Sequence, residues 1–220
     1  MPAYANAKSR FGALWERTIG KGGAAAAWRA LNTGYSDPHR AYHNWSHITA
    51  MLAGLDEAQA ATEVDGADLG AVELAIFFHD AVYDPRAKDN ETKSADLFRS
   101  CVSDTHLDKA MADHIIGMIL ATATHPASSD KATRLLLDLD LRVLGGTSEQ
   151  YLGYSDAVRA EYAFIPEEQW RLGRTAVLRG FLDRTAIYQT AYFLTRYEAL
   201  ARANLQSEIE KLTLKAMRAG

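Results

Sequence analysis

A chain of 220 residues, 48% of them hydrophobic, is long enough for one large globular domain or two small ones. Its formal net charge of −4 argues against nucleic acid as the main partner, because phosphate backbones are bound by concentrated Lys and Arg. The single cysteine excludes an internal disulfide, and no run reaches the roughly 18 apolar residues of a membrane span, so we expect a cytoplasmic protein with no membrane partner.

Helical patterns follow one another along the whole chain, and alternation at period two never persists. Apolar residues recur at helical spacing between Gly, Pro and polar stops, and the longest polar gap is short enough to connect two helices. The expected helices span 9–20, 23–34, 44–60, 68–83, 88–102, 108–125, 130–146 and 148–165, with two or three more between 166 and 219. The sequence therefore predicts a single all-α domain.

The segment 68–83 carries an apolar run that ends in two adjacent polar residues, His79 and Asp80. On a straight helix these side chains diverge by about 100°, but they can converge on one ion if the helix ends there. An Asp after so apolar a run would be costly to bury unpaired, and a cation removes that cost. Imidazole and carboxylate together suit Mn²⁺, Fe, Co²⁺, Ni²⁺ or Zn²⁺.

Other histidines and acidic residues have the spacing of possible partners. His43 and His47 are four residues apart and share a face if both are helical. Asp138 and Asp140 lie in a Leu-rich helix and point about 160° away from each other, so at most one belongs to the same site. Two further histidines, His39 and His106, lie in polar, loop-like contexts, and we expect them to be core or surface histidines that bind no ligand.

His47, then the His79-Asp80 doublet, then an Asp inside a later helix resemble the signature of the HD superfamily of metal-dependent phosphohydrolases, which is all-helical. The phrases YHNWSHI, FHDAVYDP…DNE…SA and LDLDLRVLG resemble a bacterial branch of predicted HD-domain hydrolases of about this length. The resemblance covers residues from about 35 to 165. It implies one HD-type domain over residues 1–220, with C-terminal helices from 166 to 219 packing on the motif core.

The resemblance implies that a divalent metal ion (Mn, Co, Ni, Fe, Zn or Mg) is held by four residues, His47, His79, Asp80 and Asp140. Asp138 would then support these ligands or cap the helix. Some HD proteins hold a second ion with extra histidines between the doublet and the final Asp. His125 is the first candidate for that role here, and His114 is the second.

Two carboxylates after the doublet are candidate catalytic residues. Some nucleotide-cleaving HD members carry a Glu three residues after the doublet's Asp, where this chain has Tyr83, and Asp84 matches the acid that follows that Glu. Glu91 offers another carboxylate, although an acidic residue there also suits a helix N-terminus. Pro85 is expected to end the helix near Asp84 and bring this carboxylate to the edge of the site.

Phosphate binding requires positive or donating groups, and Lys88, Arg159 and His43 are the candidates; His43 could instead orient the ligands. The resemblance implies hydrolysis of a small phosphorylated substrate, with nucleotides the leading class, by a metal-activated water. Two alternatives stay open: a di-metal oxygenase that depends on His125, and a nucleotide-sensing domain without catalysis. The long final helix could form a homodimer or close the single domain.

Overall fold

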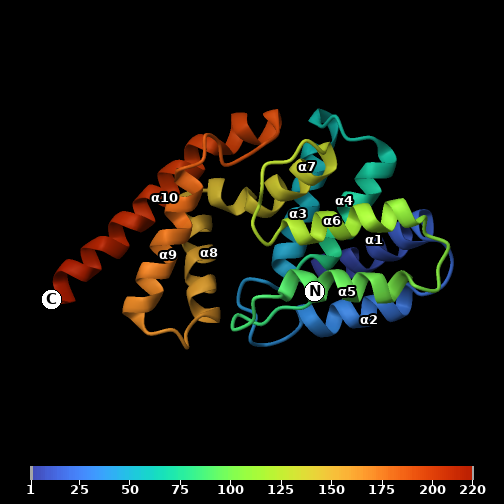
Figure 1. The fold of residues 1–220 in the computed structure, drawn as a ribbon, viewed down its shortest axis with the longest axis horizontal. Coiled ribbons are helices and arrows are strands. Elements are labelled where there is room, and N and C mark those ends of the chain that lie inside the picture. The colour runs from blue at the N-terminus through green and yellow to red at the C-terminus, as the bar shows by residue number, and fades with distance from the viewer. Residues whose placement is uncertain (1, 220) are drawn as a thin grey trace. The chain divides into compact units, whose positions relative to one another are not determined.

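The structure, a computed structural model, describes residues 2–219 and the side chains of residues 5–214, and its regular elements are all helices (Figure 1). The α-helices are α1 (Pro2–Thr18), α2 (Ala24–Tyr35), α3 (Trp45–Ala58), α4 (Gly66–Phe78), α5 (Asn90–Val102), α6 (Lys109–Ala121), α7 (Lys131–Asp140), α8 (Ser148–Glu161), α9 (Glu167–Leu182) and α10 (Ala191–Ala219). Two 3₁₀ helices, η1 (Gln59–Ala61) and η2 (Leu141–Gly145), follow α3 and α7. The all-α prediction is confirmed.

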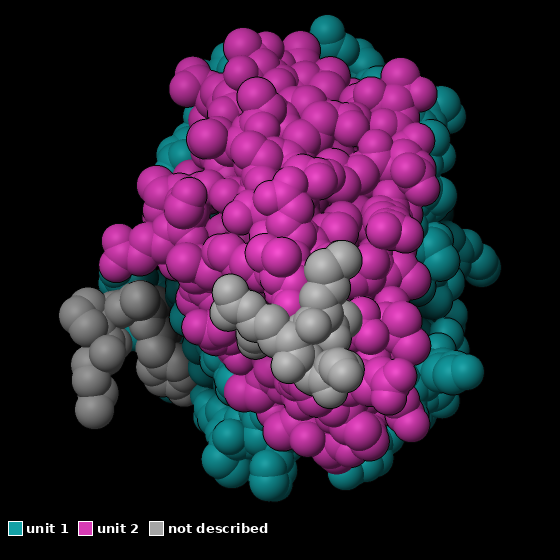
Figure 2. All heavy atoms as spheres, turned by 90° about the vertical axis from the view of Figure 1, so that its left-hand side faces the viewer, with its two compact units in different colours: residues 1–140 teal, residues 141–220 magenta. Residues whose placement is uncertain are grey.

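The chain divides into two compact units, residues 1–140 and 141–220 (Figure 2). Unit 1 contains α1 to α7, and unit 2 contains η2 and α8 to α10. The single HD-type domain expected over residues 1–220 stays a prediction. None of the described helices combines the length and the apolar character needed to cross a bilayer.

Helix α4 forms the centre of unit 1. Asp65 begins it by accepting hydrogen bonds from the amides of Ala67 and Asp68, and the helix is buried continuously from Gly70 to Phe78. It contacts α1, α3, α5, α6 and α7. Apart from Glu73, which pairs with Arg10, this buried stretch is apolar on all sides, and such a helix is stable only when other helices surround it. These neighbours therefore fix the position at which α4 ends and the doublet begins.

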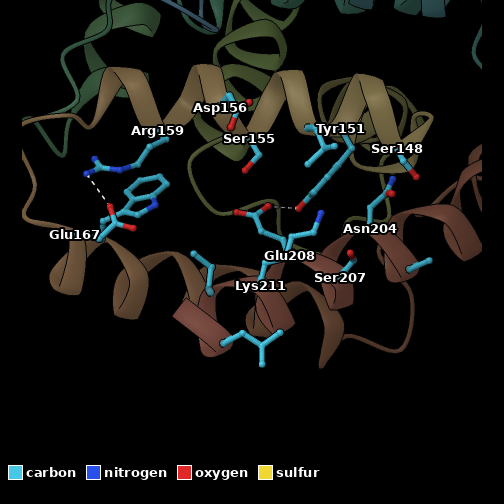
Figure 3. A pocket seen from close by; sticks show the side chains of 15 residues that line it. Ser148, Tyr151, Ser155, Asp156, Arg159, Glu167, Asn204, Ser207, Glu208 and Lys211 are labelled. Carbon is cyan, nitrogen blue, oxygen red and sulfur yellow. Dashed lines mark hydrogen bonds and ion pairs between the residues drawn. The ribbon is translucent and has the colours of Figure 1, made fainter. Parts of the chain in front are cut away.

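Unit 2 encloses a buried ion pair beside a cavity of about 580 Å³ (Figure 3). Arg174 Nε donates to Glu208 Oε1 at 2.9 Å, and Tyr151 Oη donates to Glu208 Oε2 at 2.6 Å. Burial favours a higher pKa for Glu208, but the hydrogen bonds and charge of Arg174 outweigh it and lower this pKa. Residues of α8 and α10 face each other across the cavity (Figure 3), and Trp170 of α9 also lines it.

Candidate metal centre

Four side chains that the sequence singles out converge in unit 1, and we call them the His–Asp cluster: His47, His79, Asp80 and Asp140. The Nε2 atoms of His47 and His79 are 3.3 Å apart. Asp80 Oδ2 lies 3.0 Å from His79 Nε2 and 3.7 Å from His47 Nε2. Asp140 Oδ1 lies 3.1 Å from His47 Nε2 and 3.6 Å from His79 Nε2. Two nitrogens and two carboxylate oxygens therefore face one point.

These separations fit the ligand atoms of a single ion. Two donors each about 2.1 Å from a metal lie about 3.0 Å apart at a right angle and about 3.4 Å apart at the tetrahedral angle. The distances in the cluster span 3.0 to 3.7 Å, and His47, His79 and Asp80 form a group that could hold a metal ion. The nitrogen and oxygen donors suit a first-row divalent metal.

Helix ends bring the four residues together. His47 is the third residue of α3, which begins where the side chain of Asn44 accepts the Ser46 amide hydrogen. Helix α4 has Phe78 as its last residue. His79 is its C-cap, still with helical dihedral angles and with its amide donating to the Ala75 carbonyl, and Asp80 is the first residue beyond this cap. Asp140 is the last residue of α7. The doublet therefore lies at the end of α4, and its two side chains point to the same place.

Burial and hydrogen bonding fix the state of His79. The His79 side chain is 1% exposed, and its Nδ1 lies 3.0 Å from the carbonyl oxygen of Ile76. Since a carbonyl only accepts, Nδ1 carries a proton and Nε2 is directed to the cluster. Burial favours a lower pKa for His79, but the charges of Asp80 and Asp140 hold that pKa well above its ordinary value. A cation can replace the proton that this raised pKa retains.

The two carboxylates stay ionised despite their burial. Burial tends to raise the pKa of Asp80, but the charges of His79 and His43 lower it below its ordinary value. Burial acts in the same way on Asp140, where hydrogen bonds from histidines, that of His125 first, bring its pKa well below the usual range. Anionic oxygens next to histidine nitrogens are the state that a metal ion requires.

The two aspartates of α7 differ as the helical geometry predicts. Asp140 reaches the cluster, and its second oxygen, Oδ2, lies 2.8 Å from His125 Nε2. Asp138 is fully buried on another side of the helix. His125 thus lies beside the cluster, whereas His114 pairs with Asp130 at 3.0 Å.

The backbone after α4, residues 79–84, is held by side chains from other segments, and we call it the doublet turn. Arg40 is buried, with 8% of the residue exposed, and its guanidinium donates to the carbonyls of Asp80 (2.6 Å) and Ala81 (3.0 Å). It also donates to the carbonyl of His43 at 3.1 Å. Gly34 makes room for this arrangement, because a Cβ there would overlap the Ala81 carbonyl oxygen. Arg40 therefore joins the segment before His47 to the turn that carries Asp80.

Helix α5 binds the other side of the doublet turn. The Ser94 hydroxyl accepts from the Val82 amide at 3.1 Å and donates to the Val82 carbonyl at 3.2 Å. The Asn90 side chain likewise pairs with both the amide and the carbonyl of Asp84, at 3.0 and 2.9 Å. Sequence reasoning gives a role to Glu91 within DNE…SA and none to Asn90 or Ser94. The sequence signal that could have found Asn90 and Ser94 is their chemistry. Each side chain carries both a donor and an acceptor, so it can satisfy the amide and the carbonyl of a turn residue that has no helical partner.

The two candidate catalytic carboxylates are Asp84, the last residue of the doublet turn, and Glu91, in the first turn of α5. Asp84 is exposed, and its Oδ1 accepts the Arg86 amide hydrogen at 2.9 Å. Glu91 is half-buried in the first turn of α5. Among the described side chains, neither has a hydrogen bond or ion pair with the four residues of the cluster. A catalytic role for Asp84 or Glu91 stays a prediction.

The candidates for substrate binding have different surroundings. The His43 ring stacks on Tyr83 with centroids 4.1 Å apart and lies 6.2 Å from the His47 ring, so it borders the cluster. Lys88 is exposed in the loop before α5. Arg159 belongs to unit 2, where it donates to the Tyr162 and Ile165 carbonyls and pairs with Glu167 (Figure 3). These contacts account for the Arg159 guanidinium within unit 2.

Comparison of this chain with protein-family models, with curated proteins and with solved structures finds no match.

Proposed function

We propose that this chain is a cytoplasmic, metal-dependent phosphohydrolase that acts on a small phosphorylated metabolite, with nucleotides as the leading substrate class. The observation that supports the proposal is the convergence of His47 and His79 nitrogens with Asp80 and Asp140 oxygens at separations of 3.0 to 3.7 Å. The resemblance of the same residues to the H…HD…D signature supports hydrolysis of a phosphate ester or anhydride.

Different residues of the chain would hold the ion, accept a proton and bind the substrate phosphate. The cluster would hold the divalent ion, which when bound supplies polarisation of a phosphoryl oxygen and a lowered pKa for a water. The Ile76 carbonyl fixes the His79 tautomer, so that Nε2 is the atom offered to the ion. Asp84 or Glu91 would accept the proton of the attacking water. His43 would donate to the substrate phosphate.

Phosphate release is the direct test of this proposal. Protein freed of metal and supplied with Mn²⁺, Co²⁺, Ni²⁺ or Mg²⁺ should release phosphate or pyrophosphate from at least one member of a panel of nucleotides and sugar phosphates. The matched control is Asp140→Ala, which should be inactive under the same conditions. No release from any compound, together with tight nucleotide binding, would instead support a sensing domain.

Asp84→Asn should keep the metal and lower turnover by roughly 10²- to 10⁴-fold, the usual contribution of general acid–base catalysis. This substitution should preserve the local hydrogen bond, because the amide oxygen of Asn can still accept the Arg86 amide hydrogen. An unchanged melting temperature would show that the turn is intact, and turnover would then report the lost charge. Glu91→Gln should cost much less, and the reverse ranking would give the catalytic role to Glu91.

A di-metal oxygenase is the second candidate, since His125 lies 2.8 Å from a cluster oxygen. It requires two ions per chain and consumption of O₂. One ion per chain, with phosphate release and no O₂ uptake, would exclude it.

A further inference from the structure

His125 contacts the one oxygen of Asp140 that does not face the other cluster residues. Its Nε2 lies 2.8 Å from Asp140 Oδ2, whereas Asp140 Oδ1 lies 3.1 Å from His47 Nε2 and 3.6 Å from His79 Nε2. Both side chains are largely sheltered, with exposures of 14% for His125 and 16% for Asp140. The two oxygens of this carboxylate are therefore divided between two different sets of partners.

The backbone of His125 adopts a conformation that is uncommon for any L-residue and that the following proline disfavours. Its φ is +48°, and it is the only non-glycine among the described residues with a positive φ. L-residues rarely adopt this region. Pro126 follows, and a residue before proline prefers an extended backbone with negative φ. Glycine would fit this position better, so the backbone gives no reason for histidine here.

The side chain does give a reason. After α6 the chain continues in turns, and the His125 amide donates to the Ala121 carbonyl at 2.9 Å. With its backbone in this conformation, His125 presents Nε2 to Asp140 from outside α7. Strained backbone conformations that persist are often found where a side chain must be held in one place for function.

We propose that His125 is a positioning residue that holds Asp140 Oδ2 and leaves Oδ1 alone for the metal ion. The inference rests on the proposed metal centre. A carboxylate whose second oxygen is hydrogen-bonded offers one oxygen to an ion, whereas a carboxylate without that bond can rotate and offer both. His125 would thereby set how many ligand atoms the chain contributes.

The same nitrogen cannot serve two roles at once. If Nε2 donates to Asp140, it carries the proton, and it is then not a ligand of a second ion. The positioning role and the second-ion role therefore predict different metal stoichiometries when His125 is removed.

The test compares His125→Gly with His125→Ala, two variants that both lack the imidazole and differ in backbone preference. Each is titrated with Co²⁺ alone after metal removal, and affinity, stoichiometry and the visible absorption spectrum are recorded. We expect both to bind Co²⁺ about 10–100-fold more weakly than the parent protein, with unchanged stoichiometry. We also expect weaker visible bands, because Co²⁺ absorption falls as a second carboxylate oxygen joins the ion.

Two further measurements separate side chain from backbone. In the metal-free state, His125→Gly should melt about 2–4 °C above His125→Ala, because glycine adopts a positive φ without strain. His125→Gln, whose amide nitrogen can donate to Asp140, should recover part of the Co²⁺ affinity.

Each other outcome overturns the inference in a recognisable way. Parent-like affinity and spectrum in both the Gly and Ala variants would show that His125 does not position Asp140. The loss of one ion per chain would make His125 a ligand of a second ion. A parent protein that binds no Co²⁺ would refute the metal centre itself, and the inference with it.

Discussion

Alanine at His79 or at Asp80 is expected to remove the metal ion from the protein while leaving its helices folded. Each substitution deletes one of the converging donor atoms, and the affinity should fall by more than about 100-fold, beyond the usual effect of losing a residue that only supports a ligand. The metal content per chain, measured after purification and after re-addition of Mn²⁺ or Co²⁺, checks the first part. Far-ultraviolet circular dichroism checks the second.

His39→Ala and His106→Ala are the matched controls, because both histidines are exposed and lie outside the cluster. They should retain the parent's metal content of one to two ions per chain. If the His79 and Asp80 variants retained it as well, the assignment of the cluster as the metal centre would be wrong.

Gly34→Ala is expected to destabilise the protein by about 3 kcal/mol, at the upper end of the usual cost of overpacking. The added Cβ would overlap the carbonyl oxygen of Ala81 and lie 3.4 Å from Arg40 Nη2. That oxygen belongs to the backbone and cannot move aside as the end of a flexible side chain could. The gain in helix propensity, at most about 1 kcal/mol, does not offset this. Urea unfolding of the metal-free protein measures the difference.

Gly12→Ala provides the control, because Gly12 lies inside α1 and a Cβ there meets nothing within 4 Å. It should be neutral or slightly stabilising. The Gly34 variant should also bind metal more weakly, since the displaced turn carries Asp80. Equal stability of the two variants would mean that α2 and the doublet turn are not packed as tightly as described.

Much of the fold and the centre of the candidate site can be predicted from the sequence. The helices follow from apolar spacing within single segments, and the divergence of Asp138 and Asp140 follows from helical rotation alone. The convergence of His79 and Asp80 required one further assumption, that the helix stops at the doublet; in the structure α4 ends at Phe78, with His79 as its C-cap.

The residues that hold the doublet turn could not be predicted in this way. Arg40 contacts Asp80 across forty residues of sequence, and Ser94 contacts Val82 across twelve. Such pairings depend on how helices pack, and the periodicity of one helix carries no information about them. The conformation of His125 is a similar case, because Pro126 predicts an extended backbone, whereas His125 has a φ of +48° where its side chain contacts Asp140.

The doublet turn has a consequence for how an ion would be captured. Its carbonyls and amides are bound by Arg40, Ser94 and Asn90, which come from segments on both sides of it in the sequence. To fluctuate, the turn must break bonds to all of these segments, so its opening is tied to cooperative opening of the surrounding helices. The conformational entropy of its backbone is lost when unit 1 folds, and little remains to be lost on metal uptake. A loop between two helices thus gains the rigidity of the helices themselves.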